Sequence, residues 1–184
     1  MRNKTNTKLL FCRMAEDASQ AALRELHEAF FSSLHRLIYS LIQHKEASEE
    51  LTNDVFIQLW QGRHRLNSVE NPEVYLFIAA RNRAFAHLKA QKAVTQEINS
   101  LPDFDLAMER NPEDILISSE MITRINAAIQ ELPARCKLIF MLVKENGLKY
   151  REVAEILDVS VKTVEVQMSI AFKKLSYSIP LYIH

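Results

Sequence analysis

The residues best suited to chemistry lie in "GLKYREVAEILDVSVKTVEVQMSIAFKKL", Gly147 to Leu175. The spacing predicts two short helices, Tyr150 to Leu157 and Lys162 to Lys174, joined by a tight turn as in a helix-turn-helix. Ser160 is a candidate N-cap, and such a helix start also presents backbone N–H groups to a phosphate. The first turns of the second helix are therefore the expected base readers. The residues expected in the small core are Val153, Ala154, Ile156, Leu157, Val159, Val164, Ile170 and Leu175.

The elements that must position this motif also have helical patterns. Apolar residues recur at three- and four-residue steps over residues 23–41, the period of an amphipathic helix. A second helix is expected over residues 48–61 with Ser48 as its N-cap, because Gly62 is a natural residue to follow it. A third is expected over 72–92, with Asn71 as N-cap and proline in first position.

Pro102 and Pro112, together with Asp and Asn, indicate a connector between these helices and those that follow. Two more helical segments then precede the helix-turn-helix. The sequence predicts an all-α fold of two small helical domains joined by an acidic linker. The predicted divisions are an N-terminal extension at 1–22, a first domain at 23–92, the linker at 93–118, a second domain at 119–178 and a tail at 179–184.

Charge is unevenly distributed along the chain, although the formal net charge is zero. Residues 61–92 carry six Lys or Arg and two acids, whereas residues 93–123 carry seven acids and one Arg. Residues 124–184 again carry a basic excess, nine against six. This asymmetry favours two modestly basic modules joined by an acidic connector. Such modules are compatible with nucleic acid as a partner.

Other functions and sites are not supported by the sequence. Cys12 and Cys136 are too far apart, without a second pair of soft ligands, for a disulfide framework or a zinc site. There is no Gly-rich phosphate loop, Glu-x-x-His pair or nucleophile motif, so we expect no enzyme, catalytic residue, metal or cofactor. The run "LLFC" is short for a signal peptide, and no apolar stretch reaches 18 residues. A soluble, cytoplasmic protein is expected.

Two parts of the chain resemble a known family. "ELPARCKLIFML" and "GLKYREVAEIL", followed by "SVKTVEVQMSIAFKKL", resemble the promoter-binding region 4 of sigma-70 family factors. Upstream, "ASEELTNDVFIQLWQGR" and "YLFIAARNRAFAHLKA" resemble region 2 of the same family. The resemblance covers about Leu23 to Lys92 and Pro112 to Leu175. A short connector and no other sigma region is the layout of the extracytoplasmic-function (ECF) group.

The resemblance implies a sigma factor that binds core RNA polymerase and directs it to promoter DNA, with region 2 melting and reading the minus-10 element and region 4 reading the minus-35 element. It also implies a membrane-bound anti-sigma factor as a further partner, and no small-molecule substrate. The positions implied for polymerase binding are Glu49, Glu50, Asn53, Asp54, Gln58 and Trp60; Phe56 is interpreted as core. Those implied for the minus-10 element are Arg63, Arg65, Asn67, Tyr75, Arg81, Asn82, Arg83 and Lys89. Those implied for the minus-35 element are Lys149, Arg151, Ser160, Lys162, Thr163, Glu165, Val166, Gln167, Ser169 and Lys173.

Two positions depart from the family pattern. Asp158 stands in the turn where Gly is frequent, and Asp tolerates a left-handed conformation less well than Gly but better than most residues. Ala86 stands where an Asp is common, which removes any role of that carboxylate. These departures leave open an interaction-only protein, such as a regulator that binds polymerase without reading DNA. A helix-turn-helix transcriptional regulator that does not act as a sigma factor is the other alternative. A response regulator is disfavoured because residues 1–92 show only helical periods.

Overall fold

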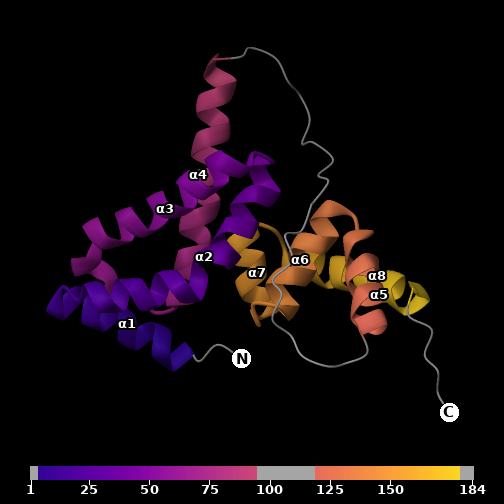
Figure 1. Ribbon diagram of the computed structural model, residues 1–184, viewed down its shortest axis with the longest axis horizontal. Helices are drawn as coiled ribbons and strands as arrows, with labels where there is room; N and C mark the ends of the chain where they lie inside the picture. Colours follow the sequence, from indigo (N-terminus) through magenta and orange to yellow (C-terminus); the bar gives the residue numbers. More distant parts are fainter. Residues whose placement is uncertain (1–3, 95–118, 179–184) are drawn as a thin grey trace. The chain divides into compact units, whose positions relative to one another are not determined.

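The computed structural model describes residues 4–94 and 119–178, and all the elements in these two ranges are helices (Figure 1). They form two compact units, the first containing α1 to α4 and the second made mainly of α5 to α8. The prediction of an all-α fold with two helical domains is confirmed. The predicted acidic linker lies, from residue 95 onward, outside the described residues.

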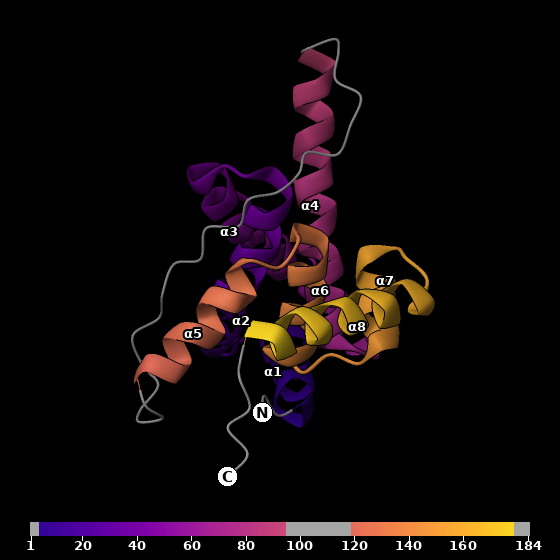
Figure 2. The same cartoon turned by 90° about the vertical axis from the view of Figure 1, so that its right-hand side faces the viewer.

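The first unit is assembled around α2. Its elements are α1 (Lys4–Asp17), α2 (Gln20–Ile42), α3 (Lys45–Gln61), the short 3-10 helix η1 (Arg63–Ser68) and α4 (Pro72–Val94). α2 packs against α1, α3 and α4 through a stripe spaced three or four residues apart that includes Leu26, Phe30 and Leu34, each no more than 2% exposed. The second half of α4 extends beyond α2 and α3 (Figures 1 and 2).

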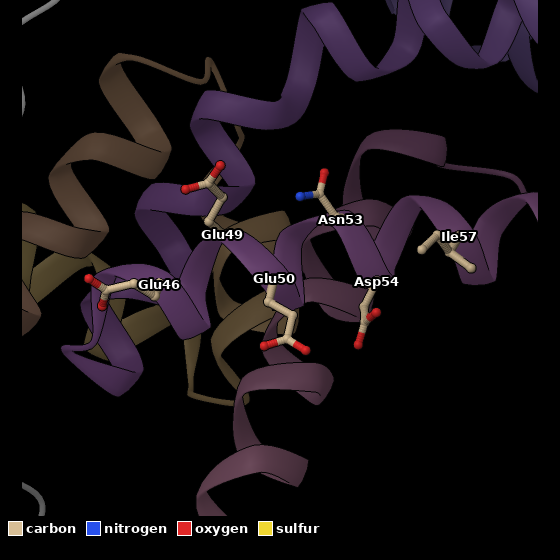
Figure 3. Close-up of a pocket in the computed structure, with 6 residues that line it drawn as sticks. All are labelled: Glu46, Glu49, Glu50, Asn53, Asp54 and Ile57. Atoms are coloured by element: carbon tan, nitrogen blue, oxygen red, sulfur yellow. The ribbon is translucent and has the colours of Figure 1, made fainter.

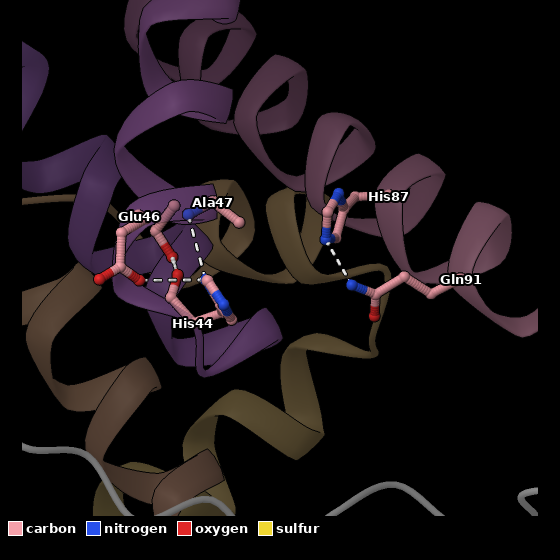
Figure 4. A network of polar contacts seen from close by, with 6 residues as sticks. His44, Glu46, Ala47, His87 and Gln91 are labelled. Atoms are coloured by element: carbon pink, nitrogen blue, oxygen red, sulfur yellow. Dashed lines mark hydrogen bonds and ion pairs between the residues drawn. The ribbon is translucent and has the colours of Figure 1, made fainter.

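The start of α3 differs from the prediction. His44, not Ser48, is the N-cap, and its Nδ1 accepts a hydrogen bond from the Ala47 N–H at 3.2 Å (Figure 4). Ser48 is buried instead, and its hydroxyl donates to the His44 carbonyl at 2.7 Å. At α4 the prediction holds, because the Val74 N–H donates to the Asn71 side chain at 3.4 Å.

The second unit consists of α5 (Ser119–Gln130), α6 (Ala134–Lys144), α7 (Tyr150–Leu157) and α8 (Val161–Ser178). Asp158 joins α7 to α8 with φ of +54°, so the turn forms with Asp in the left-handed conformation. Ser160 caps α8, since its hydroxyl oxygen accepts from the Thr163 N–H at 3.0 Å. Both sequence predictions for this turn are confirmed.

The expected small core is confirmed at five positions, whereas Leu157 and Val159 are only half-buried and the prediction for Ile170 is wrong. Ile170 is 37% exposed, whereas Met168 is 1% exposed and Ala171 is fully buried. The buried stripe of α8 runs through Val164, Met168, Ala171 and Leu175, the three- and four-residue steps of a helix, and Ile170 lies outside it. An apolar side chain is thus left on the outer surface of the second helix of the motif.

Candidate functional site

The outer face of α3 carries a shallow depression (Figure 3). It is lined by Glu46, Glu49, Glu50, Asn53, Asp54 and Ile57. Four of the six residues predicted for polymerase binding are therefore brought together. Ile57, which sequence reasoning missed, is 53% exposed among the acidic side chains. Its position seven residues after Glu50 places it on the same side of the helix, a signal that the sequence already contained.

Gln58 and Trp60 do not line this depression. The Trp60 ring lies beneath Arg63, whose guanidinium carbon is 4.8 Å from the ring centroid. Arg63 Nη1 also donates to the Trp60 carbonyl at 3.1 Å. Phe56 is 4% exposed and contacts the His27 ring, so its interpretation as core is confirmed.

The residues predicted for the minus-10 element lie on η1 and α4. Tyr75, Asn82 and Lys89 are exposed and seven residues apart, which places an aromatic ring, an amide and an ammonium along one side of α4. Arg65 and Asn67 are exposed on η1. This side of α4 therefore offers stacking, hydrogen bonding and positive charge in a row.

Arg81 and Arg83 point to different partners, as expected for residues two apart on a helix. Arg81 Nε and Nη2 donate to Asn82 Oδ1 at 3.2 and 2.9 Å. Arg83 Nη2 lies 3.2 Å from Asp54 Oδ2 on α3. Phe85, 46% exposed, has the Arg81 guanidinium 6.0 Å from its ring centroid and is a second residue that sequence reasoning missed. Arg83 is thus directed toward the acidic face of α3.

α8 presents a continuous outer stripe of polar and apolar residues. The exposed members at three- and four-residue steps are Lys162, Glu165, Val166, Ser169, Ile170 and Lys173. Lys162 Nζ lies 3.5 Å from Glu165 Oε2, so two predicted base readers pair with each other. Thr163 and Gln167 are half-buried at the margin of the stripe.

The start of α7 supplies the remaining predicted cations. Lys149 and Arg151 are exposed there, and the Lys149 N–H donates to Glu152 Oε2 at 2.7 Å. Between α6 and α8, Cys136 Sγ donates to the Gln167 carbonyl at 3.2 Å. Burial raises the pKa of the Cys136 thiol, which favours its neutral, hydrogen-bonding form.

The parts of the chain that the structure describes contain no group of three or more His, Cys, Asp or Glu side chains that could hold a metal ion. None of the helices described there is both long enough and apolar enough to cross a bilayer.

Comparison with known proteins identifies the class. The family model for Sigma-70 region 2 matches residues 26–94, and the model for Sigma-70, region 4 matches residues 122–175. The chain belongs to the sigma-70 family, and its two units correspond to these two regions.

Curated relatives narrow the assignment. The chain is 21% identical over 154 residues to the ECF RNA polymerase sigma factor SigX of Bacillus subtilis, covering 82% of this chain and 79% of the relative. It is 26% identical over 161 residues to the ECF RNA polymerase sigma factor SigE of Mycolicibacterium smegmatis, covering 84% and 60%. This protein is an ECF sigma factor that binds core RNA polymerase and promoter DNA and directs promoter-specific transcription initiation. A helix-turn-helix regulator outside the sigma family is not favoured.

Solved structures share the fold. CnrH, in complex with the cytosolic domain of CnrY, matches with a TM-score of 0.54 at 19% identity over 94% of this chain and 96% of that one. The sigma factor RpoE in complex with the anti-sigma factor NepR, from Bartonella quintana, matches with a TM-score of 0.58 at 18% identity over 86% and 97%.

Proposed function

We propose that the exposed side of α4 holds the melted minus-10 strand, and that Tyr75, Asn82 and Lys89 are its principal contacts. The observation that carries this proposal is their seven-residue spacing on one exposed side of a single helix. Extruding a base costs a few kcal/mol of unstacking, which must be offset by groups that hold the single strand. An aromatic ring for stacking, an amide for a base edge and a cation for phosphate supply those contacts.

The acidic face of α3 is the proposed docking surface for core polymerase. Glu49, Glu50 and Asp54 favour a basic partner, because complementary charge guides association and register. Ile57 adds an apolar contact in the same depression. A helical partner carrying Arg side chains beside an apolar residue fits this combination.

α8 is the proposed reader of the minus-35 element. Lys162 and Glu165 can exchange their mutual ion pair for base edges, since Lys pairs with guanine and Glu accepts from cytosine. Val166 is 46% exposed and can contact a thymine methyl group. Lys149 and Arg151 are assigned to phosphates, which position the helix without specifying sequence.

The wider setting of this function is also proposed. The protein acts in the cytoplasm as a non-enzymatic initiation factor. An anti-sigma factor restrains it; support comes from the solved relatives, one of which is a sigma factor in complex with an anti-sigma factor. The domain limits of the sequence analysis, with the first domain at residues 23–92 and the second at 119–178, stay predictions.

The test is Asn82→Ala in holoenzyme, on a promoter selected by run-off transcription from a genomic library. Promoter opening, followed with permanganate, should slow by about fivefold or more, since a good base-edge pair is worth about 1–3 kcal/mol. Closed-complex formation should be unchanged. Gln91→Ala is the matched control, because it removes a side-chain amide nine residues further along α4, which is two and a half turns and therefore the opposite side of the helix. Gln91 lies beside His87 (Figure 4). Normal opening by the Asn82 variant would refute the assignment.

A further inference from the structure

α1 lies outside the segment matched to region 2, which begins at residue 26, yet it is built into the first unit. Leu10, Phe11 and Met14 are each no more than 3% exposed, and the helix packs against η1, α2 and α4. These apolar contacts anchor α1 to the unit. They leave its polar side chains available for a different purpose.

Two of those polar side chains contact the end of η1. Lys8 Nζ donates to the backbone carbonyls of Val69 and of Asn67, the latter at 3.4 Å. Glu16 Oε1 accepts from Asn67 Nδ2 at 3.2 Å. A cation at the last carbonyls of a helix satisfies acceptors that have no partner within the helix. Lys8 and Glu16 therefore fix the chain where it leaves η1 for α4.

Two further contacts from α1 reach the first turn of α4. Thr7 Oγ1 donates to Glu73 Oε1 at 3.4 Å, and both side chains are buried. The Phe11 ring meets the Tyr75 ring edge-on, with centroids 6.2 Å apart and planes at 90°. Tyr75 remains 43% exposed, so Phe11 holds one part of the ring while the rest faces outward.

We propose that α1 is a positioning element for minus-10 recognition, and that Lys8 is its main positioning residue. The inference rests on the proposed function of η1 and α4, because its target is the segment 67–75 that carries Asn67 and Tyr75. A recognition segment held in its binding conformation loses less entropy on binding, which strengthens contacts that depend on its shape. Lys8 acts through the loop backbone and touches no base.

A purely structural role predicts a different result. Contacts at the exposed side of α1 add little to stability, whereas Leu10, Phe11 and Met14 supply the packing. Removing the Lys8 ammonium should therefore loosen the loop and leave the fold intact. The chain supplies a control in Arg13, a cation of the same helix whose Nη1 lies 3.3 Å from Glu25 Oε1 on α2, away from the loop.

The experiment uses holoenzyme reconstituted with Lys8→Met, Lys8→Arg, Glu16→Ala or Arg13→Gln. Each transcribes a promoter library with a fixed minus-35 element and a randomised minus-10 element, and RNA sequencing gives the base preference at each position. Lys8→Met should lower the minus-10 preference about threefold to tenfold, the range expected for one net hydrogen-bond contribution. Lys8→Arg and Arg13→Gln should retain the preference of the wild type. Hydrogen exchange of the amides at 66–71 should rise in Lys8→Met and in Glu16→Ala, and should stay at the wild-type level in Lys8→Arg and Arg13→Gln.

Each alternative outcome overturns the inference. An unchanged minus-10 preference in Lys8→Met, with unchanged hydrogen exchange, would show that the loop needs no support from α1. If Lys8→Met and Arg13→Gln lose transcription equally on every promoter and both melt at a lower temperature, then α1 has only a structural role. If Lys8→Met folds poorly, Glu16→Ala tests the same loop, because it removes the hydrogen bond to Asn67 and should also lower the minus-10 preference. Arg65→Ala distinguishes failure of the proposed function from failure of this inference. If it leaves the minus-10 preference unchanged, the proposed role of η1 in minus-10 recognition is itself refuted.

Discussion

Replacing Ser160 by Asp should separate the folding of α8 from its contact with DNA. The Ser160 hydroxyl oxygen accepts the Thr163 N–H at 3.0 Å and lies 2.9 Å from Thr163 Oγ1. Ser160→Ala removes this cap, which is worth about 1 kcal/mol. For a domain of about 60–100 residues, that loss corresponds to a melting temperature roughly 4–8 °C lower.

Asp and Asn retain the cap but differ in charge. Asp is as good an N-cap as Ser, and a carboxylate at a helix N-terminus adds about 0.3–1 kcal/mol, so Ser160→Asp should melt at or above the wild-type temperature. The same carboxylate faces any phosphate bound at this helix start. Two like charges about 4 Å apart repel by up to about 4 kcal/mol at an effective dielectric constant near 20. Transcription that depends on the minus-35 element should therefore fall at least about tenfold. A tenfold loss corresponds to about 1.4 kcal/mol, which is well below the upper limit of this repulsion.

The assay pairs thermal melting of the three variants with transcription by holoenzyme on a promoter that depends on its minus-35 element. Ser160→Asn should behave as the wild type in both measurements, and Ser160→Ala should melt earlier. Wild-type transcription by Ser160→Asp would refute a phosphate contact at the start of α8. A melting temperature of Ser160→Asp as low as that of Ser160→Ala would refute the capping argument.

Two further predictions concern contacts within the units. Arg83→Ala removes the ion pair with Asp54, a half-exposed contact worth about 0–1 kcal/mol. Because this frees the Asp54 carboxylate for the proposed docking surface, the affinity of labelled protein for core polymerase should rise up to about fivefold. Fluorescence anisotropy measures that affinity. A decrease in affinity would place Arg83 itself in the polymerase contact. Iodoacetamide at pH 8 should alkylate half-buried Cys12 before Cys136, because burial raises the pKa of the Cys136 thiol and the thiolate is the reactive form. Equal rates by peptide mass spectrometry would contradict that order.

The sequence predicted what depends on local chemistry. The cap at Ser160, the helix start after Asn71 and the left-handed turn at Asp158 all follow from side chains acting on their own backbone. Ser48 was wrongly predicted as an N-cap, because the prediction relied on the residue type and not on the spacing of the buried positions. Ser48 belongs to the same buried stripe of α3 as Leu51 and Val55, so it lies inside the helix, and His44 is the N-cap.

Contacts between distant segments could not be read from the sequence. Lys8 and Val69 are 61 residues apart, and Thr7 and Glu73 are 66 apart, so no local pattern links them. For this reason residues 1–22 were predicted only as an N-terminal extension, with no structural role. Nothing about Lys8 distinguishes it from any exposed lysine until the fold places η1 beside α1.

The same limit applies to the cations predicted to meet DNA. Arg63 stacks on Trp60, and Arg83 pairs with Asp54, so two of these cations lie against residues predicted to meet polymerase. The ion pair with Asp54 offsets the charge of Arg83, so Arg83 is less available to a phosphate while the pair is kept, whereas Arg63 keeps its charge when its guanidinium lies over the Trp60 ring. Electrostatic affinity grows with the number of phosphates neutralised and falls with salt in the same proportion. On the proposed function, the stacking ring of Tyr75 and the amide of Asn82 then carry more of the hold on the melted strand than Arg83 does. Such contacts act only on unpaired bases, which is what strand opening requires.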